Sequence, residues 1–166
     1  MDHVIAIDGG GTSCRALVAD GSGTPLGRGR AGSANIMTDI EGARENIVAA
    51  SEAACVDAGL SSETILSSSA LLGLAGANIG DYGERSRALL PFRRSIVETD
   101  AMIALNGALG AEHGAMAILG TGSIFMARRK GGIRSVGGWG FMVGDLGSGA
   151  RVGRALLQEA LLAHDG

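Results

Sequence analysis

Two glycine-rich turns, each placed between two strand-like apolar runs, constrain this sequence more than any other feature. The first turn is Asp8-Gly-Gly-Gly-Thr12, and the second is Gly120-Thr-Gly-Ser123. Glycine in such a turn lets an oxyanion approach the backbone without meeting a Cβ atom, and successive N–H groups form an anion-binding concavity. The two turns therefore predict that a phosphate chain is held from both sides.

Length, charge and cysteine content limit the classes of protein to consider. The 166 residues suit one domain with a buried core, and 46% of them are hydrophobic. A net charge of −3 gives no reason to expect a nucleic-acid or membrane partner. Cys14 and Cys55 lie in apolar stretches without a CxxC spacing, which indicates small buried side chains. Because no secretory leader pattern opens the sequence, a reduced, cytoplasmic location is expected.

The order of expected elements indicates an α/β fold. An antiparallel meander of strands comes first, and strands then alternate with helices, which is typical of a mixed sheet with flanking helices. In the first long helix, Thr38 and Glu41 fit a capping box, and Gly59 is placed to end the helix in the left-handed conformation. The expected strands are 4–7, 15–19, 26–30, 69–76, 95–98, 115–119 and 124–129, and the expected helices are 38–58, 79–90, 100–108 and 150–163.

Three kinds of glycine-rich phosphate-binding motif compete for these turns. The P-loop needs a lysine directly after its glycines, and Lys130 is the chain's single lysine, so a P-loop is excluded. The dinucleotide fingerprint needs a helix after the turn, whereas strand-like residues follow Cys14. The remaining interpretation is a hairpin turn between two strands.

Such hairpin turns, together with three further segments, resemble the actin-like and sugar-kinase ATPases. Residues 5–12 resemble the first phosphate motif of that superfamily, and residues 120–123 resemble the second. Gly137-Gly-Trp-Gly140 and Gly144-Asp-Leu-Gly-Ser-Gly149 closely resemble the N-acetylglucosamine kinase and BadF/BadG/BcrA/BcrD ATPase family, whose bacterial members include glucosamine kinases. The resemblance implies a ribonuclease H-like fold of the actin-like ATPase type. Leu146 departs from the acidic or amide residue expected after Asp145.

The same resemblance implies roles for individual residues. Asn35 and Asp100 fall where the family carries its sugar-contacting asparagine and its catalytic aspartate, and Asp8 is expected to face Mg²⁺. Contacts to the phosphates of ATP are expected from Gly9, Gly10, Gly11, Thr12, Gly120, Thr121, Gly122 and Ser123. Contacts to the sugar are expected from Asn35, Asp100, Gly138, Trp139 and Asp145. The structural alternatives are a turn cap for Asp8, a loop asparagine for Asn35, a helix N-cap for Asp100 and a core position for Trp139.

The function implied by the resemblance is ATP-dependent phosphorylation of an amino sugar, N-acetylglucosamine or glucosamine, at its 6-hydroxyl. Two alternatives stay open: a BadF-type ATPase that activates a partner enzyme through a cysteine-held iron–sulfur cluster, and a non-catalytic sugar- or phosphate-binding module. Family members are roughly twice as long and have two lobes. Residues 1–166 are therefore expected to be an N-terminal lobe, with 1–110 as its core and 111–166 as the start of a truncated second lobe. Homodimerisation, or association with a C-terminal lobe, is the expected form of assembly, and weak or no turnover is expected of the isolated chain.

Overall fold

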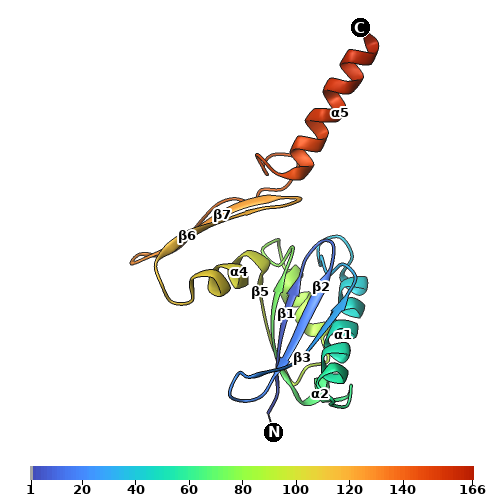
Figure 1. Ribbon diagram of the computed structural model, residues 1–166, viewed down its shortest axis with the longest axis vertical. Helices are drawn as coiled ribbons and strands as arrows, with labels where there is room; N and C mark the ends of the chain where they lie inside the picture. Colours follow the sequence, from blue (N-terminus) through green and yellow to red (C-terminus); the bar gives the residue numbers. More distant parts are fainter. Residues whose placement is uncertain (1) are drawn as a thin grey trace. The chain divides into compact units, whose positions relative to one another are not determined.

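The computed structural model describes residues 2–166, and the chain divides into two compact units, Met1–Ile103 and Ala104–Gly166. Figure 1 shows the elements in order along the chain. The strands are β1 (Val4–Gly9), β2 (Cys14–Ala19), β3 (Pro25–Ala31), β4 (Ser69–Leu74), β5 (Arg94–Thr99), β6 (Gly114–Leu119), β7 (Ser123–Arg129) and β8 (Gly132–Gly137). The helices are α1 (Ile40–Asp57), α2 (Thr64–Ser67), α3 (Tyr82–Leu89), α4 (Asp100–Leu109) and α5 (Gly149–Asp165). The assignment of 1–110 and 111–166 to two lobes stays a prediction.

The first unit is built on a mixed sheet in the order β3-β2-β1-β4-β5. Strands β1, β2 and β3 form an antiparallel meander, and β4 and β5 run parallel to β1. This arrangement confirms the predicted α/β fold class, with an antiparallel meander inside a mixed sheet and helices beside it. The parallel strands end together, because Gly9 pairs with Leu74 and Leu74 pairs with Thr99.

Helix α1 covers one face of this sheet, alongside β2 and β3 (Figure 1). The strands alternate as a half-buried sheet should: Ile5 and Ile7 of β1 are buried, whereas Ala6 between them is exposed. Small residues bring the helix close to the sheet. A Cβ atom at Gly27 would collide with the carbonyl oxygen of Ala54, and one at Gly29 would collide with that of Ala50.

The two ends of α1 differ in how well the sequence anticipates them. Gly59 has φ +71 and donates its N–H to the Val56 carbonyl, while Leu60 donates to Cys55, so the predicted left-handed cap is confirmed as a Schellman motif. The predicted capping box is wrong. Asp39 is the N-cap, and its Oδ1 atom accepts a hydrogen bond from the Gly42 N–H at 2.9 Å.

Other boundaries shift because glycines take positive φ angles. Strand β4 ends at Leu74 instead of Gly76, which has φ +92. Helix α3 begins at Tyr82 instead of Ile79, because Gly80 has φ +49 and interrupts the helical conformation. The short helix α2 was not expected from the sequence.

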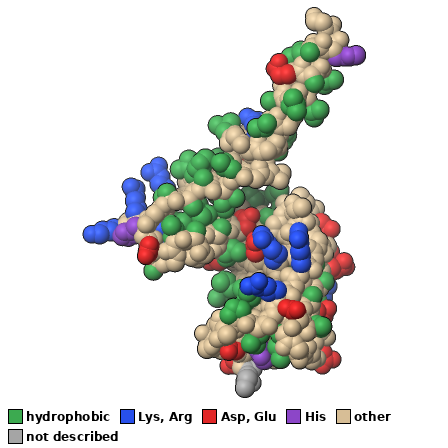
Figure 2. Space-filling view, viewed as in Figure 1, with side chains coloured by type: hydrophobic (Ala, Val, Ile, Leu, Met, Phe, Trp, Pro, Cys, Tyr) green, Lys and Arg blue, Asp and Glu red, His purple; other side chains and the backbone are tan. Residues whose placement is uncertain are grey.

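The second unit contains the antiparallel sheet β6-β7-β8 and helix α5. The hairpin between β7 and β8 turns at Gly132, which has φ +106. All residues of α5 are described, and none of them is buried; Figure 2 shows hydrophobic side chains along this helix. Within residues 2–166, no helix combines the length and the apolar character needed to cross a bilayer.

Candidate functional site

In the first unit, three predicted site segments meet at the carboxyl ends of the parallel strands. The first glycine turn follows β1, Asp100 follows β5, and the loop that carries Asn35 is tied to the same edge. Ala34 donates its N–H to the Gly10 carbonyl at 2.9 Å, and Ile36 donates to the Ala75 carbonyl, just after β4, at 3.1 Å. Ligands of open α/β sheets bind at this edge.

The glycines of the first turn are needed for different reasons. A Cβ atom on Gly9 would lie 2.6 Å from Leu74 Cδ2 and 2.9 Å from Ala34 Cβ, so Gly9 is required for packing. Gly11 has open space above it and no positive φ. Among residues 2–166, no group accepts a hydrogen bond from the N–H of Gly11 or Thr12. The turn therefore presents free donors at a position that a ligand can approach closely.

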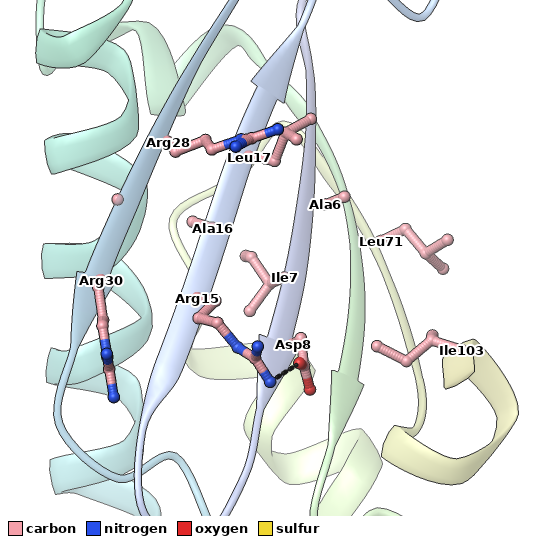
Figure 3. A pocket seen from close by; sticks show the side chains of 11 residues that line it. Ala6, Ile7, Asp8, Arg15, Ala16, Leu17, Arg28, Arg30, Leu71 and Ile103 are labelled. Atoms are coloured by element: carbon pink, nitrogen blue, oxygen red, sulfur yellow. Dashed lines mark ion pairs between the residues drawn. The ribbon is translucent and has the colours of Figure 1, made fainter. Parts of the chain in front are cut away.

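Asp8, the predicted magnesium-facing residue, lies on the sheet face opposite α1. Its Oδ2 atom forms an ion pair of 2.8 Å with Arg15 Nη2, and both side chains are partly exposed (Figure 3). Sequence reasoning did not single out Arg15, although its place directly across the hairpin from Asp8 is a usable signal. The pair borders an open hollow of about 680 Å³, where Arg28 and Arg30 of β3 also lie.

A single carboxylate is the kind of protein ligand that Mg²⁺ takes when phosphate oxygens and waters supply the remainder of its shell. In the described part of the chain, no three His, Cys, Asp or Glu side chains gather into a metal-ligand cluster. Asp8 therefore fits a magnesium ion that arrives with a phosphate ligand, and such an ion would compete with Arg15 for the carboxylate.

Asn35 is held by its neighbours and keeps part of its side chain free. Its Oδ1 atom accepts the N–H of Met37 at 3.1 Å. The side-chain NH₂ group donates to no other group among residues 2–166. This amide is therefore oriented and available to a ligand at the same edge.

Asp100 lies at the first position of α4, directly after β5. Thr99 performs the capping that was considered for Asp100, because Thr99 Oγ1 accepts the N–H of Met102 at 3.1 Å. Asp100 Oδ1 accepts the N–H of Ala101 at 2.8 Å, and the residue is half-buried. One carboxylate oxygen is thus fixed by the backbone, which leaves Oδ2 for a ligand.

In the second unit, the second glycine turn and the 144–149 turn form one hydrogen-bonded cluster. The N–H of Ser123 donates to Asp145 Oδ1 at 3.2 Å, and the Ser123 hydroxyl donates to the Leu146 carbonyl at 3.0 Å. Gly120 donates its N–H to the Gly122 carbonyl. The free donors of this turn, within residues 2–166, are the N–H groups of Thr121 and Gly122. Ser123 is buried and engaged, so its expected phosphate contact stays an untested prediction.

Trp139 and Gly138 lie next to this cluster. Gly138 donates its N–H to the Ser123 carbonyl at 2.9 Å, and Gly144 packs against the backbone of Trp139. Trp139 is 78% exposed, which is not the core position that was considered for it. An exposed indole face suits the apolar C–H face of a sugar.

Comparison with known proteins gives several amino-sugar kinases as relatives. The chain is 41% identical to glucosamine kinase GspK of Vibrio cholerae and 32% identical to an N-acetylmuramic acid/N-acetylglucosamine kinase of Clostridium acetobutylicum, over 100% and 99% of its own length. A crystal structure from Chromobacterium violaceum, provisionally named an N-acetylglucosamine kinase, superposes with a TM-score of 0.92 at 34% identity and covers 99% of the chain.

The matched proteins are longer than this chain. It spans 57% of the Vibrio cholerae protein, 55% of the Clostridium acetobutylicum protein and 58% of the Chromobacterium violaceum structure. The family model matches residues 5–166, which include both glycine turns, Asp100 and the 144–149 turn. The chain therefore belongs to the BadF/BadG/BcrA/BcrD ATPase family.

Proposed function

We propose that the protein takes part in ATP-dependent phosphorylation of an amino sugar, glucosamine or N-acetylglucosamine, at its 6-hydroxyl. The observation that carries this proposal is the carboxyl edge of β1, β4 and β5, where the first glycine turn, Asn35 and Asp100 come together. The names of the relatives support it, since one is a glucosamine kinase and another phosphorylates N-acetylglucosamine.

Phosphoryl transfer asks a protein mainly for positioning and charge stabilisation. The free N–H groups of Gly11 and Thr12, and those of Thr121 and Gly122, are suited to phosphate oxygens. The glycines support this role, because Gly11 and Gly120 have neither a positive φ nor a neighbour that a Cβ atom would meet. Asp8 would hold Mg²⁺, which when bound neutralises the charge that develops on the phosphates.

Asp100 is the proposed general base. Its Oδ2 atom would accept the proton of the sugar 6-hydroxyl as that oxygen bonds to the γ-phosphorus and the bond to the leaving ADP oxygen breaks. The Ala101 N–H fixes the other carboxylate oxygen, which orients the base without consuming it. Asn35, Gly138, Trp139 and Asp145 would contact the sugar, with the exposed indole of Trp139 against its C–H face.

The buried cysteines disfavour the alternative of an iron–sulfur activator. Cys14 and Cys55 are each 0% exposed, and burial, reinforced by the negative charge of Asp8, raises the pKa of the Cys14 thiol to about 12. Thiols bind iron as thiolates, so neither side chain is available as a ligand in this fold. A small-molecule sugar is therefore the proposed partner, and the cytoplasm is the proposed location.

The test incubates the chain, with and without a C-terminal lobe supplied as a second polypeptide, with ATP, Mg²⁺ and a panel of glucosamine, N-acetylglucosamine and glucose. Products are identified by mass spectrometry, and turnover is expected to be weak without the added lobe. The expected product is the 6-phosphate of an amino sugar. Release of inorganic phosphate without a sugar phosphate would favour an ATPase and would overturn the kinase proposal. Thermal stabilisation by sugar without any phosphorylated product would favour a binding module.

A further inference from the structure

The N–H groups that a helix normally leaves unpaired are all engaged at the N-terminus of α5, and two of them tie this helix end to the second glycine turn. Gly149 donates to the Gly120 carbonyl at 2.8 Å, and Ala150 donates to the Thr121 carbonyl at 3.4 Å. Arg151 donates to Ser148 Oγ at 3.3 Å, and Val152 makes the first bond within the helix. Because these donors are already used, the helix end serves to hold the turn.

Ser123 ties the other side of the turn to the same segment. Its N–H and its hydroxyl both donate into residues 145–146, and its side chain is 5% exposed. A buried serine with both donors engaged is poorly placed to reach a ligand. Its contacts instead fix where β7 leaves the turn.

The Asp145 carboxylate lies against Gly122 of the same turn. Its backbone has φ +54, the only positive φ at a non-glycine residue among residues 2–166. One carboxylate oxygen, Oδ1, accepts the Ser123 N–H, and the other, Oδ2, lies 3.1 Å from the place a Cβ atom of Gly122 would take. The carboxylate therefore rests directly on the segment that carries the free N–H groups of Thr121 and Gly122.

We propose that Ser123 and Asp145 are positioning residues that hold the second glycine turn in its phosphate-accepting shape and couple sugar binding to nucleotide binding. A sugar that engages Asp145 Oδ2 fixes the carboxylate rotamer, which in turn fixes the Ser123 N–H and the turn. The second glycine turn then loses its conformational freedom when the sugar binds, before the phosphates bind. The two ligands are therefore expected to bind with positive coupling. The identity of the two ligands rests on the proposed function.

The positioning part is tested without any ligand. Asp145→Gly removes the carboxylate and tolerates a positive φ, whereas Asp145→Asn keeps an acceptor oxygen and also tolerates that φ. In ¹H–¹⁵N spectra of the full chain, the amide resonances of Thr121 and Gly122 are expected to move in Asp145→Gly and to stay near their wild-type positions in Asp145→Asn. Unmoved resonances in Asp145→Gly, with the fold intact by circular dichroism, would overturn the positioning role.

The coupling part is tested by calorimetry with the non-hydrolysable analogue AMP-PNP and Mg²⁺, with and without saturating glucosamine. Glucosamine is expected to tighten AMP-PNP binding at least about fivefold in the wild-type chain. Ser123→Ala removes the hydroxyl bond to the Leu146 carbonyl, which holds the Asp145 segment against the turn, and is expected to reduce the effect to less than about twofold. Ser135→Ala, at an exposed serine of β8, is the matched control and should keep the full effect.

The outcomes separate this inference from the proposed function. Equal AMP-PNP affinity with and without glucosamine in the wild-type chain would overturn the coupling and leave the kinase proposal standing. Binding of neither ligand would overturn the coupling together with the proposed function of this chain. The amide resonances would still decide whether Asp145 positions the turn.

Discussion

Glycines that look alike in the two turns are required for different physical reasons. Gly9 fills a position where any side chain would strike Leu74 and Ala34. Gly11 and Gly120 have room for a Cβ atom and have no positive φ, so the fold itself does not demand glycine there. The proposed close approach of a phosphate would give these two positions a reason to lack a side chain.

This difference predicts opposite behaviour for two substitutions that are two residues apart. Gly9→Ala is expected to lower the free energy of unfolding by about 1–3 kcal/mol, because the added methyl group overpacks the contact with Leu74 and Ala34. Gly11→Ala is expected to leave that free energy within about 0.5 kcal/mol of wild type and to weaken AMP-PNP binding. Urea unfolding and calorimetry measure the two effects.

Two results for Gly11→Ala would contradict this prediction. If Gly11→Ala unfolded as easily as Gly9→Ala, its glycine would have a structural purpose in the turn. If Gly11→Ala bound AMP-PNP as tightly as wild type, the first turn would be a hairpin without a phosphate contact.

The substitution Asp100→Asn separates proton transfer from sugar binding. Asparagine keeps an oxygen that can accept the Ala101 N–H, so the start of α4 should be preserved. Loss of the proton acceptor is expected to reduce turnover of the amino sugar by about 10²-fold or more, with little change in sugar affinity. The check is the rate of sugar phosphate formation beside a sugar titration. A wild-type rate in the variant would rule out Asp100 as the general base.

At the scale of elements, α1 shows what local sequence can and cannot decide. Gly59 identified the helix end correctly, because a glycine after an apolar periodic run has few other uses. The start was misassigned because Thr38 and Asp39 are both good N-caps and are adjacent in sequence. A local contact in the turn before the helix decides between them. The Asn35 carbonyl accepts the Thr38 hydroxyl at 3.1 Å, which leaves Asp39 to cap the helix.

The cap assignment predicts unequal costs for two neighbouring alanine substitutions. Asp39→Ala should lower the free energy of unfolding by about 1 kcal/mol, because the Gly42 N–H loses its acceptor at the helix start. Thr38→Ala removes only an exposed hydroxyl–carbonyl contact and should cost less. Chemical unfolding of both variants gives the comparison. A larger loss in Thr38→Ala would restore the capping box.

At the scale of the whole molecule, the sequence was most reliable where a pattern repeats and least reliable where side chains from distant segments meet. The mixed sheet followed from the predicted order of an antiparallel meander and then alternating strands and helices, and its fold class is confirmed. The engagement of Ser123 with residues 145–146 could not be read from the sequence, because it depends on how the 144–149 turn packs on β7. Arg15 was overlooked for a related reason: the charge of a strand residue gains meaning only once the hairpin register sets it opposite Asp8.

The buried thiols make the free energy of unfolding fall as the pH becomes alkaline. Burial first, and the charge of Asp8 second, raise the pKa of Cys14 from 9.0 to about 12, and burial also raises the pKa of Cys55. Between about pH 9 and 12 the folded state therefore keeps a proton on Cys14 that the unfolded state has lost. Stability from this group is complete below the unfolded pKa and is lost as the pH rises through that window.

Cys14→Ala should remove the part of this pH dependence that comes from Cys14, so that a comparison with the wild-type chain measures it. At about pH 8 the variant is expected to be less stable than wild type, because a buried side chain is truncated. The difference in the free energy of unfolding between the two proteins should shrink toward pH 10.5, by at most about 1.4 kcal/mol per pH unit above 9. Only the wild-type chain has a Cys14 thiol that must stay protonated in the folded state. Cys55 is present in both proteins, so its contribution cancels in the comparison. Urea unfolding under reducing conditions at several pH values measures the difference, and a constant gap across the range would mean that Cys14 ionises as easily in the folded state as in the unfolded state.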